Sequence, residues 1–134
     1  MKPILLTVTA LIVIAFISCI DLGKSQYYMK ITGSVDITSI HMPDTVNVNG
    51  TAPIALRAEA YESCWSDLRF SLTKNTDFEY SVQAYGTYES YGNCTNAVVT
   101  GDSTLSFKPT KAGLYKFSFL KDSQSTEIDT LIVK

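Results

Sequence analysis

The chain has 134 residues and a formal net charge of −2, from 11 lysines and arginines and 13 aspartates and glutamates. This length allows one domain, and the absence of a basic stretch argues against nucleic-acid binding. Aromatic residues make up 11% of the chain, which argues against disorder over its main part. One histidine and three cysteines leave little material for a metal centre or a catalytic site.

The first 18 residues have the composition of a secretory signal. Lys2 gives a short positive start, residues 4–17 are apolar or small, and Ser18 is a small residue before a cleavage point. This apolar run is shorter than the roughly 20 residues that a membrane-spanning helix needs. We therefore expect residues 1–18 to be a signal peptide that directs export.

The tetrapeptide Phe16-Ile17-Ser18-Cys19 resembles the lipobox of bacterial lipoproteins, although phenylalanine stands where leucine is usual. In that family the cysteine is diacylated and becomes the mature N-terminus, so the resemblance implies that Cys19 carries lipid. Exported chains avoid an odd free thiol, and lipidation would account for the third cysteine. The alternatives are an unmodified Cys19 after an ordinary secretory signal, or an uncleaved anchor.

A lipid on Cys19 would place the protein in the cell envelope, anchored to a membrane, for which the outer membrane is our expectation. Residues 19–34 then serve as the lipidated cysteine and its tether, which spans at most ~50 Å if extended.

From Val35 onward the sequence shows the period-two alternation of half-buried strands and no helical period. In the stretch Pro53–Ala60, for example, every second residue from Ile54 onward is apolar and shares one face. We expect an all-β domain over residues 35–134 with about seven strands. They cover residues 35–48 with a break at Pro43, 53–60, 67–73, 78–88, 105–107, 114–119 and 126–134.

The segment Leu105–Phe119 (LSFKPTKAGLYKFSF) resembles the E–F corner of bacterial immunoglobulin-like domains. Pro109 follows a strand, Gly113 closes a turn, and Tyr115 stands in the place of the corner tyrosine. The resemblance implies an antiparallel, immunoglobulin-like β-sandwich. Fibronectin-like and other Greek-key sandwiches fit almost as well.

Cys64 follows the second expected strand and Cys94 the fourth, so both should lie at the same end of the domain. Because export brings them into an oxidising compartment, we expect a Cys64–Cys94 disulfide with a Cα separation of ~4.4–6.8 Å. Metal-binding thiolates are the alternative, but only His41 and scattered carboxylates could complete such a site. The pattern Cys64-Trp65 … Gly92-Asn93-Cys94 resembles that of small Bacteroidota-type lipoproteins, and this resemblance implies no particular activity.

The sequence carries no glycine-rich phosphate loop, no HExxH and no GxSxG motif. A lone His41 beside the Met42-Pro43 bend is more typical of a surface residue than of a catalytic base. Asp36, Asp44 and Asp102 lack the spacing of a calcium loop. We therefore expect no enzymatic activity, no cofactor and no metal site.

Four aromatic residues flank the two cysteines and form a candidate binding surface: Tyr61, Trp65, Tyr88 and Tyr91. Aromatic side chains on loops supply flat contact area for sugars or peptides. Alternatively, Trp65 packs on the disulfide and the tyrosines cover the open end of the core. The leading hypothesis is a lipoprotein whose domain binds an envelope protein or glycan partner. A purely structural or accessory subunit is the second hypothesis, and a hydrolase or metal-dependent enzyme is a distant third.

Overall fold

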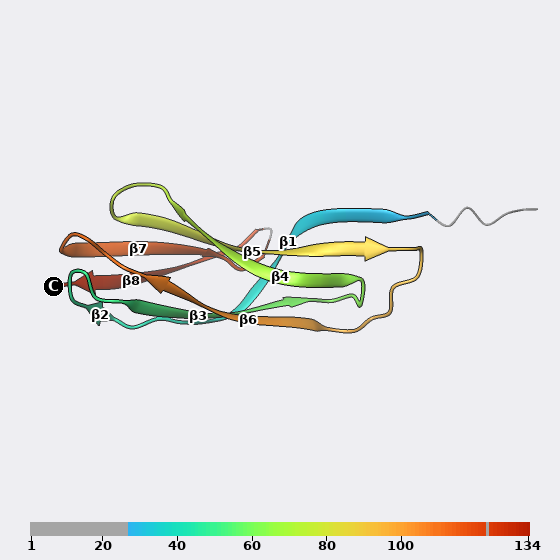
Figure 1. Ribbon diagram of the computed structural model, residues 1–134, viewed down its shortest axis with the longest axis horizontal. Coiled ribbons are helices and arrows are strands. Elements are labelled where there is room, and N and C mark those ends of the chain that lie inside the picture. Colours follow the sequence, from blue (N-terminus) through green and yellow to red (C-terminus); the bar gives the residue numbers. More distant parts are fainter. Residues whose placement is uncertain (1–26, 123) are drawn as a thin grey trace, which may run out of the picture.

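The computed structural model describes residues 27–122 and 124–134, and within these ranges every regular element is a strand (Figure 1). The prediction of an all-β fold is confirmed. No helix in the described part of the chain could cross a membrane. The expected signal peptide and Cys19 lie outside the described residues. The strands are β1 (Met29–His41), β2 (Thr45–Val46), β3 (Ala52–Ala60), β4 (Trp65–Lys74), β5 (Glu79–Ser90), β6 (Val99–Phe107), β7 (Gly113–Leu120) and β8 (Thr126–Val133).

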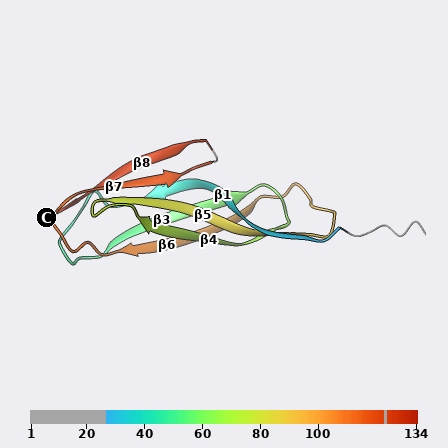
Figure 2. The same ribbon diagram turned by 90° about the horizontal axis from the view of Figure 1, so that it is seen from above.

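Seven strands form one hydrogen-bonded path in the order β2-β8-β7-β5-β1-β3-β6. The eighth strand, β4, lies off this path and pairs with β5. β1 joins the two parts of this path. Its first half pairs with β5, as far as Val35 opposite Ala84, and its second half pairs with β3, from Asp36 opposite Glu59 onward. The sheet curls where β1 crosses, so that the two parts face each other (Figures 1 and 2).

Two pairings differ from the wholly antiparallel arrangement that we predicted. β5 lies parallel to β7, and the short β2 lies parallel to β8. The break at Pro43 separates β2 from β1, which gives eight strands where we expected about seven. The period-two pattern predicts which face of a strand is buried, but it contains nothing about the direction of the neighbouring strand.

The folded part begins earlier than the predicted boundary at residue 35. Residues Met29–Ser34, which we assigned to the tether, pair one by one with β5, from Met29 opposite Ser90 to Ser34 opposite Tyr85. Hydrogen bonding to β5 brings this segment into the sheet although none of its six residues is buried. The tether prediction is therefore wrong for these six residues.

The core lies between the inward faces of the curled sheet. Its largest fully buried side chains include Phe117, Phe119, Ile37, Ile54 and Leu131. The alternation predicted for residues 53–60 is confirmed, because the apolar positions from Ile54 to Ala60 are buried along β3. The hydrophobic effect of this apolar face, rather than any local preference, positions β3 against the rest of the core.

The corner between β6 and β7 has the geometry that its sequence predicts. Tyr115 is buried and its hydroxyl donates a hydrogen bond to the carbonyl oxygen of Lys111 at 3.0 Å. Gly113 has φ +149°, and a Cβ at this position would lie 2.8 Å from the Phe78 ring. Glycine is therefore required here both for the backbone conformation and for the close approach of Phe78.

The β4–β5 turn and the β6–β7 turn lie at the end of the molecule opposite the start of β1 (Figure 1), and Asp77 in the first turn connects them. Its carboxylate lies 2.7 Å from Lys74 in the same turn and 2.7 Å from Lys111 in the β6–β7 turn. The hydrogen bond from Lys111, followed by that from Lys74, lowers the pKa of Asp77 from 3.8 to about 2.

We expect Asp77 to titrate near pH 2 in the folded protein, measured by NMR through its carboxyl carbon. A folded-state pKa below the unfolded value means that the stabilising contribution is complete above about pH 4 and is lost as the pH falls through about 2. The Lys111→Ala variant should raise the pKa of Asp77, whereas Lys116→Ala, which removes another exposed lysine, should leave it unchanged. An ordinary pKa in the wild-type protein would contradict the ion pairs.

Candidate functional site

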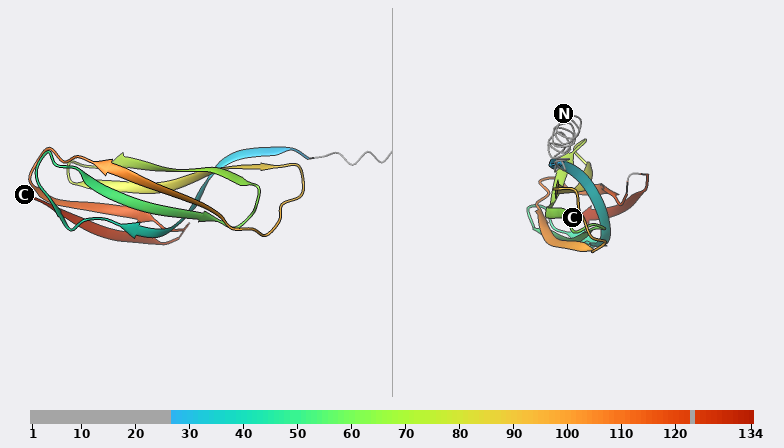
Figure 3. Two further views of the ribbon diagram at one scale, coloured as in Figure 1. Left: turned by 60° about the horizontal axis from the view of Figure 1, so that its bottom comes forward. Right: turned by 90° about the vertical axis from the view of Figure 1, so that its right-hand side faces the viewer.

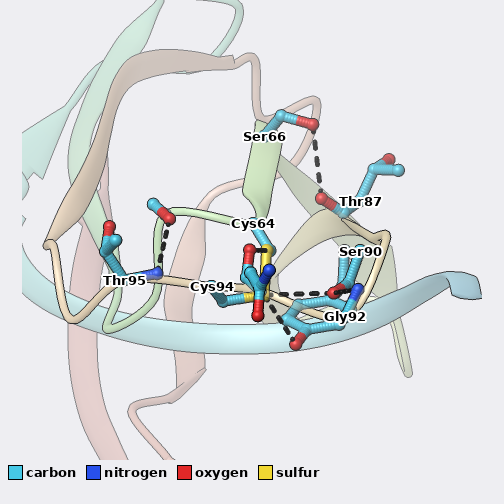
Figure 4. Close-up of a disulfide and its surroundings, with 10 residues drawn as sticks. Cys64, Ser66, Thr87, Ser90, Gly92, Cys94 and Thr95 are labelled. Atoms are coloured by element: carbon cyan, nitrogen blue, oxygen red, sulfur yellow. Dashed lines mark hydrogen bonds between the residues drawn. A yellow bond between two sulfur atoms is a disulfide. The ribbon is translucent and has the colours of Figure 1, made fainter. Parts of the chain in front are cut away.

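The predicted disulfide is present and links the β3–β4 loop to the β5–β6 loop (Figure 4). Cys64 and Cys94 have a Cα separation of 5.5 Å, within the expected range, so this prediction is confirmed. The loops are also joined by hydrogen bonds between Ser63 and Thr95, each 3.0 Å long. The Tyr88 hydroxyl lies 3.1 Å from Cys94 Sγ. The covalent bond and these contacts hold the two loops at one end of the domain.

Trp65 is half-buried and has a packing role. It stands opposite Tyr88 in the β4–β5 ladder, and the two rings meet edge to face with centroids 5.3 Å apart. The indole also covers two glycines that are paired across β1 and β5. A Cβ on Gly33 would lie 3.0 Å from the ring, and one on Gly86 would lie 2.9 Å from it. The contacts of Trp65 therefore favour the structural alternative for this residue.

A β-bulge explains why Trp65 and Leu68 pack on the same side of the sheet. Residues three apart point to opposite faces in a regular strand, but the β4–β5 register shifts between Ser66 and Arg69. Asp67, within this shift, has φ +52°. As a result Leu68 joins Trp65 over Gly86, 2.7 Å from the position of a Cβ there. Sequence periodicity did not reveal this bulge, because the extra residue resembles an ordinary strand position.

The four aromatic residues of the predicted surface do not form one patch. Trp65 and Tyr88 pack on each other. Tyr91 is 60% exposed and its ring lies 4.9 Å from that of Tyr28, which was not among the predicted site residues. Tyr61 is 58% exposed and lines a hollow with Trp65 where β1 crosses between the two parts of the sheet, and among the described residues its ring does not pack on that of Tyr91. The adjacent tyrosines at 27 and 28 were a visible signal, but they stood in the segment assigned to the tether.

Two adjoining hollows at this crossing, which we call the waist, share Asp36 and Tyr61. The smaller has a volume of about 210 Å³ and the larger about 440 Å³. Partial burial, and next the negative charge of Asp122, raise the pKa of Asp36. The Asp122 carboxylate accepts hydrogen bonds from Gln124 and Ser125. The remaining polar or aromatic residues around the two hollows are Ser34, Thr38, Glu59, Glu62, Trp65 and Lys121.

A third hollow, of about 490 Å³, lies on the solvent-facing side of β1, β3 and β6 and includes Ser39, His41 and Asp102. These residue types could serve nucleophilic catalysis if they were in contact. Arg57 instead holds the Asp102 carboxylate with hydrogen bonds of 2.7 and 3.1 Å. Across residues 27–122 and 124–134, no hydrogen bond joins His41 to a serine or aspartate side chain, and no group of three potential metal ligands is found.

The chain matches no protein-family model, no curated protein and no solved structure.

Proposed function

We propose that the protein is an exported lipoprotein, anchored at Cys19 to a membrane of the cell envelope, whose β-domain binds a protein or glycan partner without catalysis. The observation that carries the anchor is the disulfide between Cys64 and Cys94. It leaves Cys19 as the remaining one of three cysteines, separated by Ser18 from the apolar segment of residues 4–17. Because exported proteins rarely keep an unpaired thiol, lipidation of Cys19 accounts for this count.

We expect intact-mass spectrometry of the membrane-purified protein to show a mature chain that begins at Cys19 and carries acyl groups. Cells fed with labelled palmitate should incorporate the label. The Cys19→Ser variant is the matched control, and it should lose both the label and the processing. A mature chain with another first residue, or with an unmodified Cys19, would contradict the proposed anchor.

The waist supports partner binding better than the other described surfaces. An exposed tyrosine ring can stack on the C–H face of a sugar, and nearby carboxylates can accept hydrogen bonds from its hydroxyl groups. At the waist, Tyr61 stands beside Asp36 in both hollows, and Glu62 lines the smaller one. We therefore propose a glycan of the cell envelope as the preferred class of partner.

Replacing Tyr61 with alanine should weaken glycan binding while leaving the fold intact, because the side chain is largely exposed. Truncation of an anchoring aromatic typically costs about 2 kcal/mol or more, roughly thirtyfold in affinity. Binding can be measured by calorimetry with solubilised peptidoglycan fragments and surface polysaccharides. Leu114→Ala, a change at an equally exposed apolar residue on β7, is the matched control. Wild-type affinity in the Tyr61→Ala variant would remove the waist from the proposal.

If the wild-type protein binds none of these glycans, a protein partner or the accessory role remains. Binding to a purified envelope protein that is lost in the Tyr61→Ala variant would identify a protein partner.

A further inference from the structure

Four apolar side chains, on both faces of the sheet, are exposed at the end of the molecule where β1 begins. They are Tyr27 (74% exposed), Tyr28 (48%), Ile31 (49%) and Tyr91 (60%), and we call them the tip cluster. Large apolar groups scattered singly over a surface need no explanation, but several concentrated at one end of a domain indicate a contact surface. The disulfide between Cys64 and Cys94 lies at the same end.

Contacts at the start of β1 and the end of β5 position part of the tip cluster. The Tyr28 ring packs against that of Tyr91 at an angle of 40°, and its hydroxyl donates a hydrogen bond of 3.1 Å to Glu89. Lys30 lies 3.1 Å from the same carboxylate, which lowers the pKa of Glu89. Ile31 follows Lys30 directly in β1 and stands opposite Tyr88, so it points to the other face of the sheet at this end. Lys30 and Glu89 carry opposite charges, so this pair adds no net charge beside the tyrosine rings.

The position of the tip relative to the rest of the chain indicates what covers it. Figures 1 and 3 show the start of β1 at one end of the long axis and the C-terminus at the opposite end. Cys19 precedes Tyr27 by eight residues. A chain of this length spans at most about 29 Å, whatever its conformation. A lipid on Cys19 would therefore keep the tip close to the bilayer surface.

We propose that the tip cluster inserts into the headgroup layer of the membrane that holds Cys19, as a second contact beside the lipid. This inference rests on the proposed lipid anchor. Tyrosine is enriched at membrane–water interfaces because its ring is apolar and its hydroxyl remains hydrated. The contact orients the domain upright, with the C-terminal end directed away from the membrane. The waist then lies above the bilayer surface, open to a partner.

The full lipidated protein, reconstituted in vesicles of phosphatidylethanolamine and phosphatidylglycerol, provides the test. A Tyr91→Trp variant places a fluorescent probe in the tip cluster, and a Leu114→Trp variant places one on β7 at the C-terminal end. Both retain Trp65 as a common background. Lipids brominated on their acyl chains should quench the added emission of Tyr91→Trp and leave that of Leu114→Trp unchanged. Adding Tyr28→Ser and Ile31→Ser to the Tyr91→Trp variant should reduce its quenching, although the tether is unaltered.

The outcomes separate this inference from the proposed anchor. If the protein fails to float with the vesicles, both proposals are overturned. If it floats but the two probes are quenched equally, or neither is quenched, the anchor stands and the tip contact is overturned. Sedimentation in detergent tests whether a second copy of the chain occupies the tip instead. A dimer that requires Tyr28 and Ile31, together with no quenching in vesicles, would overturn the membrane contact and assign the tip to that second copy.

Discussion

Replacing Trp65 with alanine should lower the free energy of unfolding by about 3 kcal/mol, at the lower end of the range for large aromatic residues because the side chain is only half-buried. The indole covers the paired Gly33 and Gly86, which have no side chains of their own, and it packs edge to face on Tyr88. Its loss would leave a cavity over bare backbone. Urea denaturation followed by circular dichroism measures the change.

Two further variants make this prediction specific. Trp65→Phe should recover part of the lost stability, since a smaller ring still covers the glycines. Tyr91→Ala should change stability by less than about 0.5 kcal/mol, as is usual for an exposed position. A Trp65→Ala variant as stable as the wild type would contradict the packing role and restore Trp65 as a candidate binding residue.

Trp65 also lines the smaller hollow of the waist, so its replacement would alter that surface as well as the core. For this reason Tyr61→Ala, rather than Trp65→Ala, is the informative variant for partner binding. A binding loss in Trp65→Ala would be ambiguous between the two effects.

Removing the disulfide with the double change Cys64→Ser/Cys94→Ser should cost about 3–4 kcal/mol of stability. The bond closes a loop with a sequence separation of 30 residues, and its absence increases the conformational entropy of the unfolded chain. Unfolding by urea, monitored for the double variant and for the wild type with and without dithiothreitol, measures this cost.

Reduction of the wild-type protein is the control, and it should lower the stability to a similar extent as the double substitution. The variant should also show a larger dependence of unfolding free energy on urea, because an uncrosslinked chain exposes more surface when it unfolds. A loss below about 1 kcal/mol would show that the hydrogen bonds between Ser63 and Thr95 hold the two loops without the covalent link.

Local patterns in the sequence predicted the parts of this structure that depend on single strands. The alternation over residues 53–60 identified the buried face of β3, and the Pro109–Gly113–Tyr115 pattern identified the corner in which Tyr115 bonds to Lys111. The disulfide could also be predicted, because counting strands between Cys64 and Cys94 places them at one end. The buried face follows from side-chain period, the corner from its resemblance to a known turn, and the disulfide from strand counting together with the expected oxidising compartment.

Only the tertiary structure decided which strands pair and where the candidate surfaces lie. The pairing of Met29–Ser34 with β5, the parallel contact of β5 with β7 and the bulge at Asp67 depend on hydrogen bonds between segments far apart in the chain. These pairings separate Tyr61 at the waist from Tyr91 at the tip, although the sequence grouped both around the cysteines. Side-chain periodicity records which face of a strand avoids water, whereas the partner of each strand is selected by backbone hydrogen bonds that every residue type except proline can both donate and accept.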